Sequence, residues 1–350
     1  MRLGLNLGYQ TPWSSPKDHL ALAQEADRLG YSSVWAAEAY GSDSPSILAW
    51  IAGQTERIDV GTAVMQIPAR TPATTAMTAA TIDTISGGRF RLGLGVSGPQ
   101  VSEGWHGVRY GKPLARTRQY IEIVKLALSR KQVVYEGEHY TLPLPDGPGK
   151  ALRLSFHPLR SEIPIYLAAV GPKNLELAGE LTDGWLAVFF DPGMAPEFLA
   201  SIAKGRAKVG KDLTGFDIVP SVPVVLGDDP EMCAELVRWY AALYIGGMGS
   251  REKNFYNELA TRMGYGEAAR EIQELYLSGR QRDAAAAVPF EFIDRTSLLG
   301  PVPRIAERMR EFAAAGVTTL AISLFTGDAE SGQAALRSVA EAHELSGTGD

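Results

Sequence analysis

Polar side chains at the ends of predicted strands are the first candidates for chemistry. Glu38 follows the apolar run VWAA, where a carboxylate is costly to bury unless it is paired. We therefore predict for Glu38 either a proton-handling role or a structural ion pair. Tyr40, two residues further on, carries a phenol that can supply or accept a proton. Asn6, near the end of the first predicted strand, either positions a substrate or is satisfied inside the fold.

A glycine-rich turn follows another predicted strand, at GLGVSG (residues 93–98). It meets a proline instead of opening an amphipathic helix, so it does not match a dinucleotide-binding fingerprint. Its backbone N–H groups can approach a flat ligand closely, although an ordinary tight turn is the alternative. The residues concerned are Gly95, Val96, Ser97 and Gly98.

The best candidate for an anion site is the segment that opens a helix after residue 170. Pro172 suits a first helical turn, because its missing N–H group is harmless there. The free N–H groups of such a turn favour a phosphate, and Lys173 adds positive charge. An ordinary capped helix is the alternative. The whole segment comprises Ala169, Val170, Gly171, Pro172 and Lys173.

Several familiar catalytic signatures do not occur in the sequence. It has no GxSxG, HExxH or GxxxxGK[ST] motif, and no GxGxxG that opens a helix. The five histidines lack metal-ligand spacing, so no metal site is predicted. His19 and His343 are expected on helix surfaces. Cys233 is the only cysteine, which excludes an intramolecular disulfide.

Composition and charge place the chain in an ordinary globular class. Of the 350 residues, 45% are hydrophobic and 21% are charged, and the formal net charge is −6. This charge gives no indication of nucleic acid or an anionic membrane as a partner. The N-terminal segment lacks the apolar core of a signal peptide, and no apolar run is long enough to span a membrane. We expect a cytoplasmic protein.

Short apolar strands alternate with amphipathic helices, and these elements must position the candidate residues. Strands are predicted at residues 3–7, 33–37, 58–64, 89–95, 163–169, 185–190, 216–226 and 317–324. Helices are predicted at residues 17–29, 47–54, 73–85, 115–130, 173–181 and 304–315. Eight such strands predict an α/β fold in the form of a closed (β/α)8 TIM barrel. We expect one barrel domain over residues 1–350.

Two segments interrupt the alternation and are predicted to be insertions in the βα loops. Residues 131–157 contain a strand-like pair, and residues 246–287 are polar and helix-prone. Barrel enzymes build substrate pockets from such loops. Four loop aromatics could line a pocket, although loop aromatics also cap cores and interfaces: Trp13, Trp105, Tyr110 and Tyr256.

Five sequence stretches together resemble the bacterial luciferase-like superfamily, and more closely its coenzyme F420-dependent oxidoreductases. The stretches are VWAAE at 34–38, DVGTAVMQIPARTP at 59–72, TISGGRFRLGLGVSGP at 84–99, GKPLARTRQYI at 111–121 and IYLAAVGPKNLELAGELTDGW at 165–185. The resemblance covers residues 1–200 strongly and 288–325 weakly. It does not by itself separate F420 from FMN.

The resemblance implies where a cofactor would lie. Ala63, Val64 and Met65 are apolar and by themselves predict only packing, but in F420-dependent members the matching strand end is a bulge with a non-prolyl cis peptide. Here that bond would join Ala63 and Val64. The bulge would back the deazaflavin ring, residues 95–98 would approach the ring edge, and residues 169–173 would hold the phosphate.

The sequence departs from the family's sugar-phosphate and alcohol dehydrogenases at three positions. Those relatives have a histidine after the acidic residue of strand two, where this chain has Ala39. They have a glutamate where this chain has Gly98, and a lysine where it has Asp191. Their substrate chemistry is therefore not carried over, and Glu38, Tyr40 and Asn6 remain the candidates for proton handling or substrate positioning.

The expected function is hydride transfer between coenzyme F420 and a small organic molecule. An FMN-dependent monooxygenase is the alternative, and a non-catalytic cofactor-binding barrel is a third possibility. The partner expected from the residues is a small-molecule substrate, with neither nucleic acid nor membrane. The resemblance implies a homodimer formed through the early barrel helices.

Overall fold

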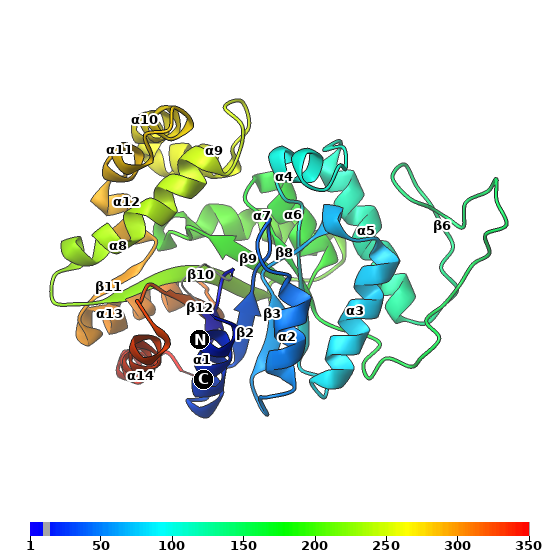
Figure 1. Ribbon diagram of the computed structural model, residues 1–350, viewed down its shortest axis with the longest axis horizontal. Helices are drawn as coiled ribbons and strands as arrows, with labels where there is room; N and C mark the ends of the chain where they lie inside the picture. Colours follow the sequence, from blue (N-terminus) through cyan, green and yellow to red (C-terminus); the bar gives the residue numbers. More distant parts are fainter. Residues whose placement is uncertain (10–14, 350) are drawn as a thin grey trace.

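Eight parallel strands close into a barrel (Figure 1). The computed structural model describes residues 1–9 and 15–349. Neighbouring strands follow the cyclic order β1-β2-β3-β5-β8-β9-β10-β12, and each of these pairings is parallel. The strands are β1 (Arg2–Asn6), β2 (Ser33–Ala36), β3 (Asp59–Thr62), β5 (Phe90–Gly95), β8 (Ile165–Ala168), β9 (Gly184–Val188), β10 (Asp217–Leu226) and β12 (Thr319–Leu324). The predicted TIM barrel is confirmed.

Helices cover the outside of the barrel (Figure 1). They are α1 (Pro16–Arg28), α2 (Ser44–Ala52), α3 (Pro72–Ile85), α5 (Pro113–Leu128), α6 (Pro172–Leu181), α7 (Ala195–Lys208), α8 (Pro230–Ala242), α13 (Val302–Ala314) and α14 (Ala329–Ser346). Local sequence explains where they begin. The Asp43 side chain caps α2, the Thr71 side chain caps α3, and each helix has a proline in its first turn.

A buried charged network closes the N-terminal end of the barrel. Asp217, the first residue of β10, accepts hydrogen bonds from Tyr166 Oη at 3.0 Å and Arg91 Nη1 at 3.1 Å. It also pairs with Arg2 at 3.0 Å, while Arg91 pairs with Asp59 at 2.6 Å. Because this network lies at the end opposite the βα loops, it stabilises the barrel and leaves the other end for the site.

Both predicted insertions lie outside the barrel cylinder, on different sides of the molecule (Figure 1). The first contains the antiparallel pair β6 (Tyr135–Glu136) and β7 (Thr141–Leu142). Because it follows helix α5 and precedes strand β8, it is an αβ connection, so its predicted place in a βα loop is wrong. The second contains α9 (Phe255–Ala260), α10 (Gly266–Leu277) and α11 (Gln281–Ala286), with the π-helical turns η3 (Leu243–Gly247) and η4 (Thr261–Tyr265). It is followed by α12 (Phe290–Arg295) and the short strand β11 (Leu298–Gly300), which pairs with β10.

The structure corrects two further expectations. A short helix, α4 (Pro99–Gly104), follows the glycine-rich turn directly, where no helix was expected. His19 is 5% exposed and does not lie on the helix surface. Its helix α1 packs against the C-terminal helix α14, a long-range contact that the periodicity of α1 cannot reveal. His343 is half-buried on α14, with its Nε2 atom 2.8 Å from the Met1 carbonyl oxygen.

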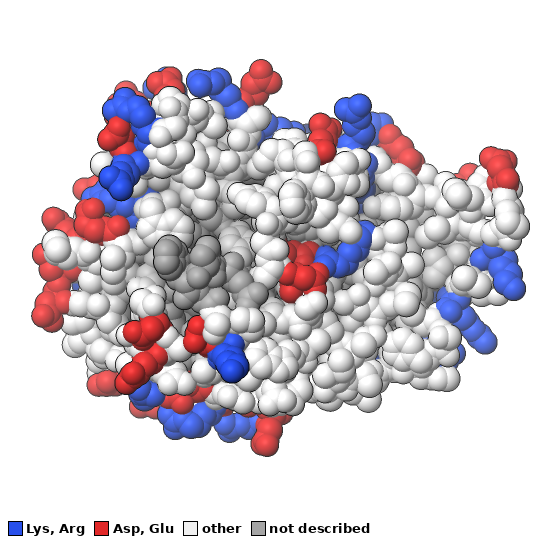
Figure 2. Space-filling model, in the orientation of Figure 1, with Lys and Arg blue, Asp and Glu red and all other residues white. Residues whose placement is uncertain are grey.

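Charged side chains lie mainly at the margins of the face seen in Figure 2, and its centre is largely uncharged apart from one patch where acidic and basic groups meet. No helix among the described residues is long and apolar enough to cross a membrane. The same residues contain no group of three or more His, Cys, Asp and Glu side chains that could hold a metal ion.

Candidate functional site

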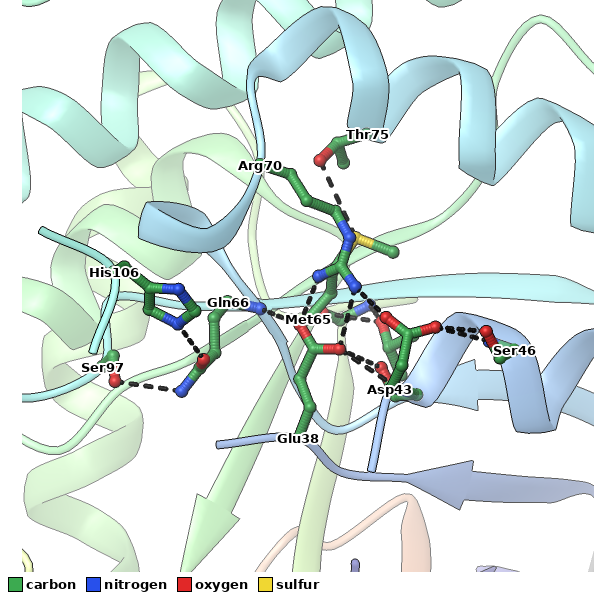
Figure 3. A network of polar contacts seen from close by, with 12 residues as sticks. Glu38, Asp43, Ser46, Met65, Gln66, Arg70, Thr75, Ser97 and His106 are labelled. Carbon is green, nitrogen blue, oxygen red and sulfur yellow. Dashed lines mark hydrogen bonds and ion pairs between the residues drawn. The ribbon is translucent and has the colours of Figure 1, made fainter. Parts of the chain in front are cut away.

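Glu38 lies just beyond β2 in a buried hydrogen-bond network (Figure 3). Its carboxylate accepts the backbone N–H of Gln66 at 2.9 Å and both the N–H and the hydroxyl of Ser44 at 3.2 Å. Both terminal nitrogens of Arg70 bond the same carboxylate, and Arg70 also pairs with Asp43. The Glu38 side chain is only 7% exposed. This arrangement is the structural ion pair that the sequence left open as the alternative.

Arg70 remains charged within this network. Burial alone would lower the pKa of Arg70, but Glu38 and Asp43 together raise it above its ordinary value. The carboxylate of Glu38 therefore faces a permanent cation and three further donors. A group held in this way is poorly placed to exchange a proton with a substrate.

Gln66 joins the end of β4 (Met65–Gln66) to the turn after β5 (Figure 3). Its backbone N–H is held by Glu38, and the residue is 4% exposed. The amide donates to Ser97 Oγ at 3.1 Å and lies 2.9 Å from His106 Nε2. Sequence reasoning missed Gln66 and His106, since neither belongs to a spaced motif.

The strand-three bulge and the glycine turn meet side by side. The peptide bond between Ala63 and Val64 is cis, as the resemblance implied. A Cβ atom added to Gly95 would lie 2.5 Å from Val64 Cγ2, so this close approach requires glycine. Ser97 has a φ of 60°, which turns the chain sharply away from β5. The fold therefore brings together these two segments, which the resemblance predicts to contact the cofactor.

The N-terminus of α6 is open to a ligand. No side chain caps it, and a Cβ atom added to Gly171 would meet nothing within 4 Å. Asn174 Oδ1 is buried and has no hydrogen-bond partner among the described residues. Arg262, from the second insertion, donates to the Val170 carbonyl at 2.9 Å. Its buried Nε also has no partner within the described part of the chain, so the positive helix end carries unused polar groups.

Asn6 acts within the barrel wall. Its amide nitrogen donates to Ser221 Oγ at 2.6 Å, and Ser221 in turn lies 3.0 Å from Ser323 Oγ. The side-chain oxygen Oδ1 of Asn6 accepts a hydrogen bond from the Gly8 N–H at 2.9 Å. Asn6 thus fixes the turn that leads to Tyr9. The structure supports the reading of Asn6 as a satisfied polar residue that positions its neighbours.

The remaining sequence candidates lie at the rim. Tyr40 is 59% exposed, and Trp105 is 66% exposed. Tyr110 is half-buried, with burial raising its pKa to about 12 and with the Lys253 ammonium 5.2 Å from its ring centre. Lys253 and Arg262 both belong to the second insertion. Their contacts with the Tyr110 ring and the Val170 carbonyl place this insertion beside the mouth of the barrel. Trp13 lies outside the described residues.

Asp191 has a structural role at the position where the dehydrogenases of the resembled family have a lysine. It accepts the Gly193 N–H at 2.8 Å and lies 3.4 Å from Arg295 in an ion pair. The side chain is 6% exposed. Its negative charge is thus neutralised locally by the Arg295 guanidinium.

Comparison with known proteins identifies the family. The model of the luciferase-like monooxygenases matches residues 2–319. The chain belongs to this family. A member from Mycobacterium tuberculosis, which carries the provisional name coenzyme F420-dependent oxidoreductase, is 44% identical over 339 residues and covers 94% of this chain and 96% of its own.

Two further proteins are similar over most of their length. The 5,10-methylenetetrahydromethanopterin reductase of Archaeoglobus fulgidus is 30% identical over 322 residues, or 91% of this chain and 92% of its own. The structure of the F420-dependent tetrahydromethanopterin reductase of Methanopyrus kandleri superposes with a TM-score of 0.82. That structure covers 97% of each chain at 23% identity and therefore supports the barrel fold alone.

Proposed function

We propose that this protein is a coenzyme F420-dependent oxidoreductase acting on a small organic molecule. The observation that carries the proposal is the open α6 N-terminus, with the buried, unpartnered Arg262 Nε donor beside it among the described residues. An anionic tail fits the free N–H groups of the helix start and this guanidinium. The F420-related name of the relative that is 44% identical supports the same cofactor.

The ring end of the cofactor would lie against the segment formed by Ala63, Val64 and Met65 and the turn formed by Gly95, Val96, Ser97 and Gly98. The segment from Ala169 to Lys173 would hold the phosphate. When bound, the deazaflavin supplies a carbon centre that carries a hydride. We assign Glu38 to fixing Gln66, and through it both ring-contact segments, because Arg70 and Ser44 already use the carboxylate. Tyr40 is the rim phenol that would exchange the accompanying proton with solvent.

Parallel titrations of the purified protein with F420 and FMN test the cofactor. We expect F420 to bind more tightly than FMN. Lys173→Ala should weaken F420 binding about 2- to 5-fold, because an exposed cation at a helix terminus contributes a modest electrostatic term. The matched control Lys211→Ala removes an exposed lysine that follows α7 and should leave F420 affinity unchanged. Tighter FMN binding, or oxygen consumption with reduced FMN and no turnover with F420, would favour the monooxygenase.

A homodimer formed through the early barrel helices is part of the proposal. Trp50 on α2 and Met77 on α3 are 38% and 55% exposed, so both helices present apolar side chains on their outer faces. Light scattering of the purified protein measures its mass directly. A monomeric mass at working concentrations would contradict the proposed homodimer and would not affect the cofactor proposal.

A further inference from the structure

Four tyrosines from three separate parts of the chain gather near the end of β1. Tyr9 follows β1, Tyr240 lies in α8, Tyr244 lies in η3 and Tyr256 lies in α9. The hydroxyls of Tyr9 and Tyr244 are 3.1 Å apart. The ring centres of Tyr240 and Tyr244 are 4.7 Å apart, and those of Tyr244 and Tyr256 are 4.8 Å apart. We call this group the tyrosine cluster.

The ends of two barrel strands pack against the tyrosine cluster. Phe189, directly after β9, lies 5.6 Å from the Tyr240 ring, 5.7 Å from the Tyr244 ring and 6.3 Å from the Tyr256 ring. Its φ of 54° is uncommon for a bulky L-residue, so the surrounding packing must hold the backbone there. Phe325, directly after β12, lies 5.6 Å from the Tyr240 ring. Since these are carboxyl ends of barrel strands, the cluster belongs to the mouth of the barrel.

Hydrogen bonds of the preceding turn fix the position of Tyr9. Asn6 accepts the Gly8 N–H, and the Gly8 carbonyl accepts the Ala37 N–H at 2.9 Å. The turn before Tyr9 is thereby tied to both β1 and β2. A phenol on such an anchored turn is oriented before any ligand arrives, which lowers the entropic cost of binding.

The environment of the four hydroxyls is uncharged. Burial raises the pKa of all four tyrosines, so their hydroxyls remain protonated donors at neutral pH. Among the described residues, the hydroxyls of Tyr9 and Tyr244 pair with each other, and no ion pair or side-chain hydrogen bond joins the four hydroxyls to Asp, Glu, Lys or Arg. An anionic ligand would lose its hydration here without gaining a countercharge.

Two contrasts separate the cluster from ordinary core tyrosines. The core residue Tyr31 donates to the Leu336 carbonyl at 2.9 Å, and Tyr166 donates to Asp217. Tyr256 instead packs its ring against those of Tyr244 and Phe189. Tyr256 is also half-buried, as is Tyr9, so both side chains retain access to the mouth. A hydroxyl at a half-buried position is accessible to a ligand.

We propose that the tyrosine cluster is the substrate-binding site and that it takes an uncharged, flat carbonyl compound such as a cyclic enone. The hydroxyls donate to the carbonyl oxygen, and the rings pack against the conjugated plane. The absence of a countercharge among the described neighbours disfavours carboxylates and phosphate esters. This inference rests on the proposed function, because the substrate of a hydride-transfer enzyme must share the mouth with the cofactor.

The test measures binding of 2-cyclohexen-1-one to the F420-loaded protein by calorimetry, with 1-cyclohexene-1-carboxylate as the matched anion. We expect the enone to bind and the carboxylate to bind at least about 10-fold more weakly. Tyr9→Phe and Tyr256→Phe retain the rings and remove one donor each, so each should weaken enone binding about 3- to 10-fold. Tyr140→Phe, next to β7 in the other insertion, should change nothing.

F420 affinity is measured for every variant, which separates the two proposals. The inference is overturned if both cluster variants bind the enone as tightly as the wild-type protein does, or if the carboxylate binds as tightly as the enone. The proposed function is tested separately, by the F420 affinity. If a variant fails to fold, the wild-type protein with isotope-labelled tyrosines replaces it. Enone addition should then shift cluster resonances and not those of the remaining tyrosines, and shifts confined to tyrosines outside the cluster would contradict the proposal.

Discussion

Replacing Glu38 by Gln separates a structural ion pair from a catalytic acid. The change keeps the shape of the side chain and removes its charge. Glu38 receives hydrogen bonds from Gln66, Ser44 and Arg70 at a position where its side chain is 7% exposed. A glutamine offers one acceptor oxygen and places an NH2 group against one of these donors, so at least one donor loses its partner.

The expected size of the effect follows from the two partners of Arg70. Removing one member of a buried ion pair costs about 3–5 kcal/mol. Arg70 keeps its contact with Asp43, whose side chain is 46% exposed, so the lower end of this range applies. We therefore expect Glu38→Gln to lower the free energy of unfolding by about 3 kcal/mol. A catalytic proton donor would instead contribute about 10²- to 10⁴-fold to kcat.

The assay combines urea unfolding, F420 titration and turnover at saturating cofactor with whichever enone the protein reduces. We expect reduced stability and several-fold weaker F420 binding, because Glu38 holds the Gln66 backbone next to the bulge. The kcat per folded molecule should change by less than about 10-fold. Asp43→Asn is the matched control, since it removes the half-exposed partner of Arg70 and should cost less than about 1 kcal/mol.

One pattern would refute this reasoning. If Glu38→Gln left the unfolding midpoint unchanged but reduced kcat by more than about 100-fold and abolished one limb of the pH profile, Glu38 would be the acid. A double-mutant cycle with Arg70→Gln measures the coupling free energy between Glu38 and Arg70. A coupling of zero would show that the ion pair does not stabilise the protein.

Three further variants probe the site and the scaffold. Gly95→Ala places a methyl group against Val64, so stability should fall by about 1–3 kcal/mol and F420 binding should weaken; unchanged affinity would contradict the packing argument. Gln66→Leu removes both side-chain hydrogen bonds of a buried amide and should cost about 1–2 kcal/mol with weaker F420 binding, both read from titrations. Burial lowers the pKa of His19, so the unfolded chain binds more protons than the folded one as pH falls below about 6.5, and stability decreases there. His19→Asn should reduce that loss in urea unfolding between pH 7 and pH 5, whereas exposed His157→Asn should not.

The barrel itself could be predicted from the sequence because its signals are local. Each buried parallel strand is a short apolar run, and each following helix repeats apolar residues at helical spacing. Proline at helix starts marks several boundaries, as in α6. The cis peptide between Ala63 and Val64 was foreseen through family resemblance, not through the physics of those two apolar residues.

The roles of the polar residues were decided by the tertiary structure. Glu38 and Arg70 are 32 positions apart, and only closure of β2 beside β3 brings them together. Tyr9 and Tyr244 are 235 positions apart, and their contact requires the second insertion to fold back over the mouth. A single sequence records residue types and local periodicity. It does not record which distant donor neutralises a buried carboxylate, and that pairing determines whether the group is structural or free to react.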